Sequence, residues 1–244
     1  MPNWVMNEVT VEGEEDKVKE LFSFIKSKET AFDFNILIPM PESLNMDSGS
    51  MEDICLSAYL SAINPTTQDV GEEKMELEKF AELVEKLKCE GHVARLELDL
   101  KEIKQEDKEK GKQYLDNFLK YNSTTWYDWR IDNWGCKWNA ADAEVYDNKI
   151  SFRTPWSAPL PIFEALAQKF PDVQITCAYS EEQFGIYVGK IIFKNNKVVE
   201  EIEYEEYSKE AYELAAELWG IDLEEDGYKF DESLNTYVYV ADDD

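Results

Sequence analysis

Apolar residues alternate with polar residues near both ends of this chain, whereas between residues 50 and 123 they recur at the spacing of a helix. A period of two gives a strand one core-facing side, and a period near 3.6 gives a helix one apolar stripe. The alternation predicts strands over residues 3–12, 142–147, 149–154, 173–180, 184–193, 197–203 and 236–240. The helical spacing predicts helices over residues 14–28, 54–63, 77–87, 107–121, 159–170 and 209–218.

The order of these elements predicts the fold class. Without the central helical stretch, the chain is close to a βαββαβ arrangement, which is the ferredoxin-like order. We therefore predict an α+β fold in which residues 1–199 form a ferredoxin-like domain with an antiparallel sheet. A mainly helical insertion interrupts this domain at about residues 45–123, and residues 200–244 form an acidic C-terminal extension that packs on it or trails from it.

Three local features of the pattern carry their own predictions. In the first strand Trp4, Met6, Val9 and Val11 are set against polar residues that include Asn7. Its alternation slips between Met6 and Val9, which a β-bulge would absorb. Residues 32–41 are expected to be an extended segment that ends in a turn, because Pro39 and Pro41 fit poorly in a central strand. Residues 95–105 alternate leucines but are rich in helix formers, so both structures stay open there.

Negative charge is concentrated at the C-terminal end. The chain has 53 acidic and 25 basic residues, and its formal net charge is −28. Residues 200–244 hold seventeen of the acidic residues but only two of the basic ones. Such a field repels nucleic acids and anionic membranes and attracts basic proteins. The alternative interpretation is that the acidity only keeps the protein in solution.

The sequence lacks the residues that most catalytic and metal-binding motifs require. His92 is the only histidine, and we interpret it as a solvent-exposed loop residue rather than a catalytic one. The four cysteines are far apart and the glycine-rich phosphate loops are missing, so we expect no catalytic residue, no metal and no cofactor. Isolated cysteines, the lack of a signal peptide at the N-terminus and the absence of a long apolar run predict a cytoplasmic protein without a membrane span.

The most unusual segment is rich in tryptophan and lies between residues 126 and 139. Stacked aromatic rings next to cations could form a groove for a base, a sugar or a peptide. The candidate groove residues are Trp126, Trp129, Arg130, Trp134, Lys137 and Asn139. The competing interpretation is structural, because large aromatic residues often lock a helix end onto a sheet.

Several short motifs, specific as a set, resemble one family. They are Pro2-Asn3-Trp4 with Asn7, Phe34-Asn35 with Ile38-Pro39-Met40-Pro41, Trp126-Tyr127 with Trp129-Arg130, Trp134-Gly135 with Lys137-Trp138-Asn139-Ala140, Phe152, Thr154, Trp156 and Pro159, and Leu218-Trp219-Gly220. Together they resemble the YubB-like family of phage- and plasmid-borne bacterial proteins, outside residues 45–110. The sequence departs from that family at Cys136 and Val5, where Thr and Cys are more common. The resemblance implies a ferredoxin-like domain and a bacterial mobile element, but no established activity.

Three hypotheses about function follow. The first is a non-enzymatic acidic protein that inhibits a basic, nucleic-acid-directed host or defence protein by charge mimicry. Its acidic face would consist of Glu201, Glu203, Glu205, Glu206, Asp222, Glu224, Glu225 and Asp226. The second is a ligand- or nucleic-acid-binding module that uses the aromatic groove, although direct nucleic-acid binding conflicts with the net charge. The third is a metal-dependent enzyme that uses carboxylates.

Overall fold

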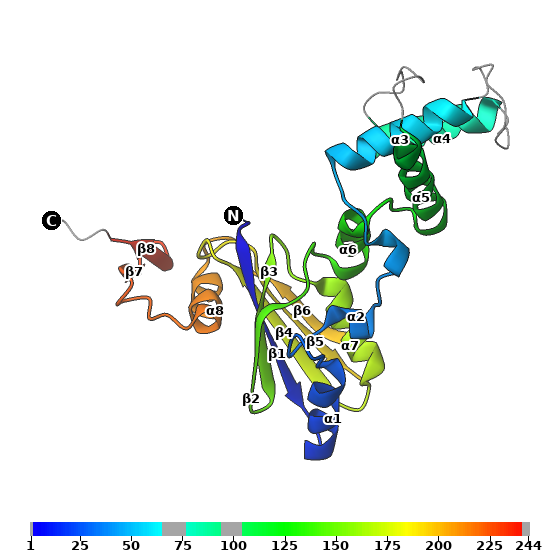
Figure 1. Cartoon of the computed structure of the whole chain (residues 1–244). Helices are drawn as coiled ribbons and strands as arrows, with labels where there is room; N and C mark the ends of the chain where they lie inside the picture. Colours follow the sequence, from blue (N-terminus) through cyan, green and yellow to red (C-terminus); the bar gives the residue numbers. More distant parts are fainter. Residues whose placement is uncertain (1, 65–76, 94–103, 241–244) are drawn as a thin grey trace. The chain divides into compact units, whose positions relative to one another are not determined.

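The computed structural model describes residues 2–64, 77–93 and 104–240 (Figure 1). The chain divides into two compact units. The first, here called the sheet unit, comprises Met1–Pro39 and Arg130–Asp244, and the second, the helical unit, comprises Met40–Trp129. None of the helices within the described residues has the length and apolar character needed to cross a membrane.

The sheet unit is built on six antiparallel strands in the order β2-β3-β1-β4-β5-β6. Their bounds are β1 Trp4–Glu12, β2 Ala141–Tyr146, β3 Lys149–Pro155, β4 Gln174–Glu181, β5 Val188–Lys194 and β6 Lys197–Glu203. The first four strands, with helices α1 (Glu15–Ile25) and α7 (Leu160–Lys169), follow the βαββαβ order. The predicted α+β, ferredoxin-like fold is therefore confirmed, with β5 and β6 added beyond β4.

The central strand β1 is regular, and the predicted bulge is wrong. Its pairing with β3 and β4 continues without a register shift, and the buried positions are Val5, Asn7, Val9 and Val11. Asn7 therefore takes a core position that the hydrophobic pattern assigned to the other face. Its Nδ2 donates hydrogen bonds to Val5 O at 2.9 Å and to Thr154 Oγ1 at 2.9 Å, which satisfies the buried amide N–H groups.

Helices cover both faces of this sheet. Figure 1 shows α1 and α7 on one face and α8 (Lys209–Trp219) on the opposite face. Leu21 and Ile25 of α1, Phe163 of α7 and Phe152 of β3 are all fully buried, and the rings of Phe152 and Phe163 lie 6.5 Å apart.

Residues 32–41 are not a continuous extended segment, which corrects that prediction. Phe34–Leu37 form the short helix α2, because the Asp33 side chain caps it by accepting a hydrogen bond from Asn35 N at 3.0 Å. Phe34 is fully buried and packs edge-on against Phe32 and Trp134.

The helical unit has its own core. Its elements are the 3₁₀ helix η1 (Glu42–Leu44) and the helices α3 (Ser50–Ile63), α4 (Leu77–Cys89) and α5 (Gln105–Tyr121). Leu56, Leu60, Leu87, Tyr114 and Phe118 are among its buried residues. Most of the ambiguous segment 95–105 lies outside the described residues.

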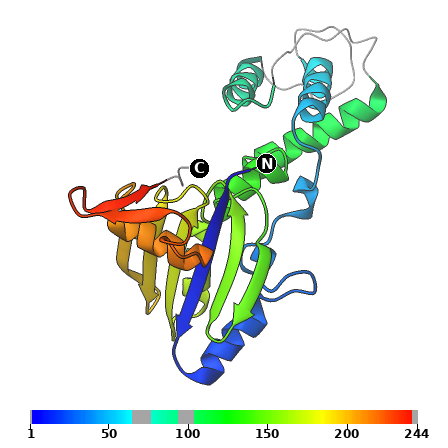
Figure 2. The same ribbon diagram turned by 90° about the vertical axis from the view of Figure 1, so that its left-hand side faces the viewer.

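The last described residues form a hairpin that packs on α8 (Figure 2). The predicted strand over 236–240 is present as β8 (Thr236–Tyr239). It pairs with β7 (Tyr228–Asp231), which was not predicted from the sequence. Tyr228 and Tyr237 contact Tyr212 of α8 with ring centroids 5.5 and 5.9 Å apart. Residues 200–240 thus belong to the sheet unit as an ordered extension.

Candidate functional site

The acidic residues predicted to bind a partner lie on segments that lead into and out of α8. Glu201 and Glu203 are on the edge strand β6, and Glu205 and Glu206 follow in the loop to α8. The second group, Asp222 with Glu224 to Asp226, lies in the loop between α8 and β7. All eight side chains are exposed. We call residues 200–240 the acidic extension.

These carboxylates have no counter-charge within the part of the chain that the structure describes. No lysine, arginine or histidine of residues 2–64, 77–93 or 104–240 forms an ion pair with any of the eight. The acidic extension holds fourteen acidic and two basic residues, and one of its bases, Lys209, lies 3.6 Å from Glu213. Its negative field is therefore directed to solvent with little internal neutralisation.

Large apolar side chains are also exposed on the acidic extension. Leu234 at the hairpin turn is 64% exposed and Tyr239 of β8 is 66% exposed. Tyr207, Phe230 and Val240 are also exposed. A surface that combines charge with exposed aromatic and aliphatic residues has the composition of a protein interface, in which a few such residues contribute most of the affinity.

The predicted aromatic groove is largely used for internal packing. Trp134 is fully buried, its Nε1 donates to Ile38 O at 2.9 Å, and the Arg130 guanidinium lies 4.7 Å from its ring. Asn139 accepts a hydrogen bond from Phe34 N at 2.9 Å and donates to the Asp33 carboxylate at 2.9 Å. These residues hold α2 and the end of α6 (Trp126–Trp134) in the sheet unit.

The other members of the groove differ in their exposure. Trp129 is buried and Trp126 is half-buried, and both belong to the helical unit because the boundary between the units falls within α6. Lys137 is the member that faces an exposed surface. Its Nζ lies 4.2 Å from the ring of Trp138 and 3.9 Å from the ring of Trp156, which are 36% and 50% exposed.

Trp138 and Trp156 were missed as candidate residues. Both lie within or next to the tryptophan-rich segment, but the sequence does not show which indoles reach solvent. Trp156 has a φ of 66°, an uncommon conformation for a bulky residue and one that is found more often at functional sites.

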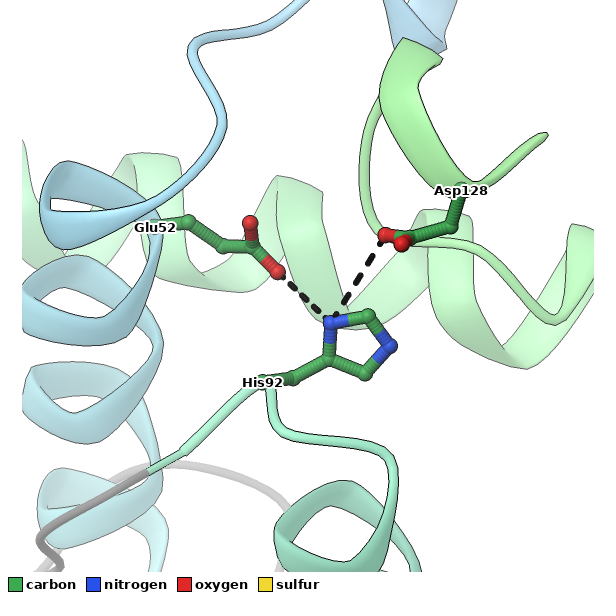
Figure 3. A group of neighbouring side chains, drawn as sticks. All are labelled: Glu52, His92 and Asp128. Atoms are coloured by element: carbon green, nitrogen blue, oxygen red, sulfur yellow. Dashed lines mark hydrogen bonds and ion pairs between the residues drawn. The ribbon is translucent and has the colours of Figure 1, made fainter. Parts of the chain in front are cut away.

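One cluster of chemically reactive groups lies in the helical unit (Figure 3). His92 Nδ1 is 2.8 Å from Glu52 Oε1 and 3.9 Å from Asp128 Oδ2. Thr124 Oγ1 donates to the same Glu52 oxygen at 2.5 Å, and Gly49 N donates to Glu52 Oε2 at 3.2 Å. We call Glu52, His92 and Asp128 the His92 cluster.

The prediction of an exposed loop histidine is wrong, because the His92 side chain is only 7% exposed. It follows Gly91 just after α4, and its backbone N–H donates to Leu87 O at 2.9 Å, which turns the chain back over the helix end. Its ring packs edge-on against Phe118 at 5.5 Å. Glu52 is equally buried, in the first turn of α3. The sequence around His92 did not indicate that the side chains of His92 and Glu52 are buried.

Electrostatics favour the charged forms of both buried partners. Burial alone lowers the pKa of His92, but the Glu52 hydrogen bond and the negative charges of Glu52, Asp128 and Glu90 raise that pKa above 6.5 overall. Burial alone raises the pKa of Glu52, but hydrogen bonds from His92, Thr124 and Gly49 N lower that pKa below 4.5 overall.

The match to a family model lies within the sheet unit. Residues 133–222 match a family model described as the ferredoxin-like domain in Api92-like protein. This part of the chain is similar to the Api92-like proteins. The matched residues run from the end of α6 to the loop after α8, which is less than half of the chain.

Among solved structures, the crystal structure of a protein api92 from Yersinia pseudotuberculosis is similar to this chain. The two are 13% identical with a TM-score of 0.40, and the match covers 84% of this chain and 99% of that one. No curated protein matches the chain.

Proposed function

We propose that this chain is a non-enzymatic binding protein that uses its acidic extension to engage a basic protein. The observation that carries the proposal is the set of eight exposed carboxylates that have no ion pair within the described residues. Uncompensated surface charge of one sign accelerates encounter with a partner of opposite sign and rejects partners of the same sign.

The partner class follows from the same charge pattern. Proteins that bind nucleic acids carry basic surfaces that neutralise phosphates. To such a basic surface, a dense group of exposed carboxylates offers a negative field similar to that of the phosphates. The resemblance to the YubB-like family supports a phage or plasmid source, action in the cytoplasm of the bacterial host, and a nucleic-acid-directed host or defence protein as the target.

The apolar residues of the hairpin would supply affinity that charge alone does not provide. Exposed ion pairs contribute little each, whereas aromatic side chains at the centre of an interface contribute much more. Phe230, Leu234 and Tyr239 are exposed on the same extension as the carboxylates. We therefore expect binding that salt weakens strongly without abolishing its specificity.

Capture of a partner from bacterial lysate tests this proposal. Tagged protein is incubated with lysate at about 50 mM and at about 500 mM salt, with duplex DNA as a competitor, since electrostatic contacts are screened over this range. Specific retention of a basic nucleic-acid-binding protein at low salt, and its displacement by DNA, would support the proposal. Retention that neither salt nor DNA reduces would contradict it.

Lys137, Trp138 and Trp156 together form what we call the Lys137 surface. It favours a second candidate function, the binding of a planar anionic ligand. An ammonium between two exposed indoles offers charge and stacking together, as nucleotide-binding surfaces do. Titration with nucleotides and short oligonucleotides, followed by tryptophan fluorescence, tests it. Quenching that Trp156→Ala removes would support this function.

A further inference from the structure

The His92 cluster has the donor set of a metal centre. One imidazole nitrogen and two carboxylate oxygens, contributed by Glu52, His92 and Asp128, lie within 4.8 Å of one another. Figure 3 shows both carboxylates directed at Nδ1 of the imidazole. Glu52 lies at the start of α3, His92 in the turn after α4, and Asp128 in α6. All three belong to the helical unit.

The spacing of the donors fits a first-row divalent ion with small adjustments. Such an ion binds nitrogen and oxygen ligands at about 2.0–2.2 Å, so neighbouring donors are roughly 2.8–3.6 Å apart, from octahedral to tetrahedral geometry. The His92 Nδ1 atom is 2.8 Å from Glu52 Oε1 and 3.9 Å from Asp128 Oδ2, which bracket that range. Asp128 has a side chain 37% exposed, so it can close the difference by rotating, and solvent can reach the open side of the site.

Outer hydrogen bonds orient these ligands, as they do in metal centres. Gly49 N and Thr124 Oγ1 each donate to the Glu52 carboxylate and fix its plane. On the far side of the ring, His92 Nε2 faces the Glu90 carboxylate at 3.7 Å. A carboxylate behind the non-ligating nitrogen is a recurring partner of metal-bound histidine, because it favours the tautomer that leaves the ligating nitrogen available.

We propose that Glu52, His92 and Asp128 bind one divalent transition-metal ion, with Zn²⁺ and Mn²⁺ as the best candidates. Two carboxylates and a neutral imidazole balance a double positive charge, so the occupied site would be electrically neutral where it is most buried. Imidazole suits Zn²⁺ and carboxylates suit Mn²⁺, so a mixed set accepts either ion. The site lies in the helical unit, outside the acidic extension, and so does not depend on the proposed function.

The informative variant is Asp128→Asn. Asp128 is the most exposed of the three ligands, so its loss should leave the Glu52–His92 contact and the fold intact. Asp116→Asn is the matched control, because it removes one exposed carboxylate from the same unit away from the cluster. All three proteins are first treated with chelator and then titrated with ZnCl₂ and MnCl₂ by calorimetry, with melting temperature as a second readout.

We expect the wild type and Asp116→Asn to bind one ion per chain and to melt at a higher temperature with metal. Asp128→Asn should bind at least about tenfold more weakly while melting like the wild type in chelator. A wild type that binds neither ion, or an Asp128→Asn variant that binds as tightly as the wild type, would overturn the proposal. The first result would mean that Glu52 and His92 form only a buried ion pair. The second would mean that the ion binds elsewhere on the protein.

Discussion

The Nδ1 atom of His92 lies 2.8 Å from the Oε1 atom of Glu52, and both side chains are 7% exposed. This contact joins the start of α3 to the turn after α4, two segments that are 40 residues apart in the sequence. Thr124 reaches the same carboxylate oxygen from a third segment. The pair therefore ties together the helical unit, and breaking it should be measurable in the stability of that unit.

The contact predicts a stability that depends on pH in chelator-treated protein. The pKa of His92 is raised above 6.5, so its stabilising contribution is complete below pH 6.5 and is lost as the pH rises through the folded-state pKa. The pKa of Glu52 is lowered below 4.5, so its contribution is complete above pH 4.5 and is lost as the pH falls through the folded-state value. The two contributions overlap fully between pH 4.5 and 6.5.

Urea unfolding at pH 6 and at pH 8 measures this dependence. The upper limit stays below pH 9 because burial raises the pKa of the Cys55, Cys136 and Cys177 thiols, which would add a fall in stability of their own there. We expect the free energy of unfolding of the wild type to fall over this interval, and His92→Gln to lose most of that fall. His92 is the only histidine in the chain, so no other imidazole can produce the effect. An equal fall in both proteins would show that other groups cause it.

Gly111 of α5 should not tolerate alanine. An alanine in an exposed helix usually stabilises by about 1 kcal/mol relative to glycine. Here a Cβ atom would lie 2.0 Å from Cys55 O and 2.7 Å from Tyr59 Cβ, because α3 and α5 pack closely at this point. We expect Gly111→Ala to destabilise by about 2 kcal/mol or more. Chemical denaturation measures it, and the neighbouring exposed change Lys112→Ala should stay within about 0.5 kcal/mol.

Two nearby tryptophans should lose different amounts of stability on truncation. Trp134 is fully buried, so Trp134→Ala should cost about 3–5 kcal/mol of stability. Trp138 is 36% exposed, so Trp138→Ala should cost less than about 1 kcal/mol. Thermal unfolding of both variants checks this difference. Similar losses in the two variants would contradict the structural role assigned to Trp134.

The Lys137 surface gives a prediction for the second candidate function. If nucleotides stack there, Trp156→Ala should weaken by about tenfold the nucleotide affinity that fluorescence quenching measures, since stacking on an aromatic ring contributes about 1–3 kcal/mol per base. Trp126→Ala, in the helical unit, is the control and should leave quenching by nucleotides unchanged. The absence of any quenching by the nucleotides and oligonucleotides would exclude this function for the surface.

The inner strands β1 and β3 could be predicted because apolar residues alternate along them and give each strand one buried face. Val9 and Val11 alternate with polar residues, and the turn at Asp147 and Asn148 separates two alternating runs. Asn7 was assigned to the wrong face because a polar residue in a core position is recognisable only when its partner, Thr154, is known. Strand β7 was missed although Tyr228 and Phe230 alternate with Lys229 and Asp231, because this alternation spans only four residues.

The candidate sites were predictable to different degrees. The charge of the acidic extension is visible in the composition, although the exposure of Glu201 or Asp222 is not. The His92 cluster could not be predicted, because its contacts depend on how three segments of the helical unit pack. Glu52, His92 and Asp128 have no common spacing or motif, and only the tertiary structure brings them together.

The central claim is that the acidic extension binds a basic partner, and a pair of charge-matched variants tests it most directly. One variant replaces four glutamates of the extension with glutamine, at positions Glu201, Glu203, Glu205 and Glu206. The control replaces four exposed glutamates elsewhere, at positions Glu20, Glu106, Glu109 and Glu164, so both proteins change net charge equally.

The measurement is the affinity of the captured basic protein for each variant at fixed salt. We predict that the extension variant binds at least about tenfold more weakly than the wild type, which corresponds to about 1.4 kcal/mol, while the control changes by less than about threefold. Equal weakening in the two variants would mean that only the total charge matters, and it would contradict a binding site on the acidic extension.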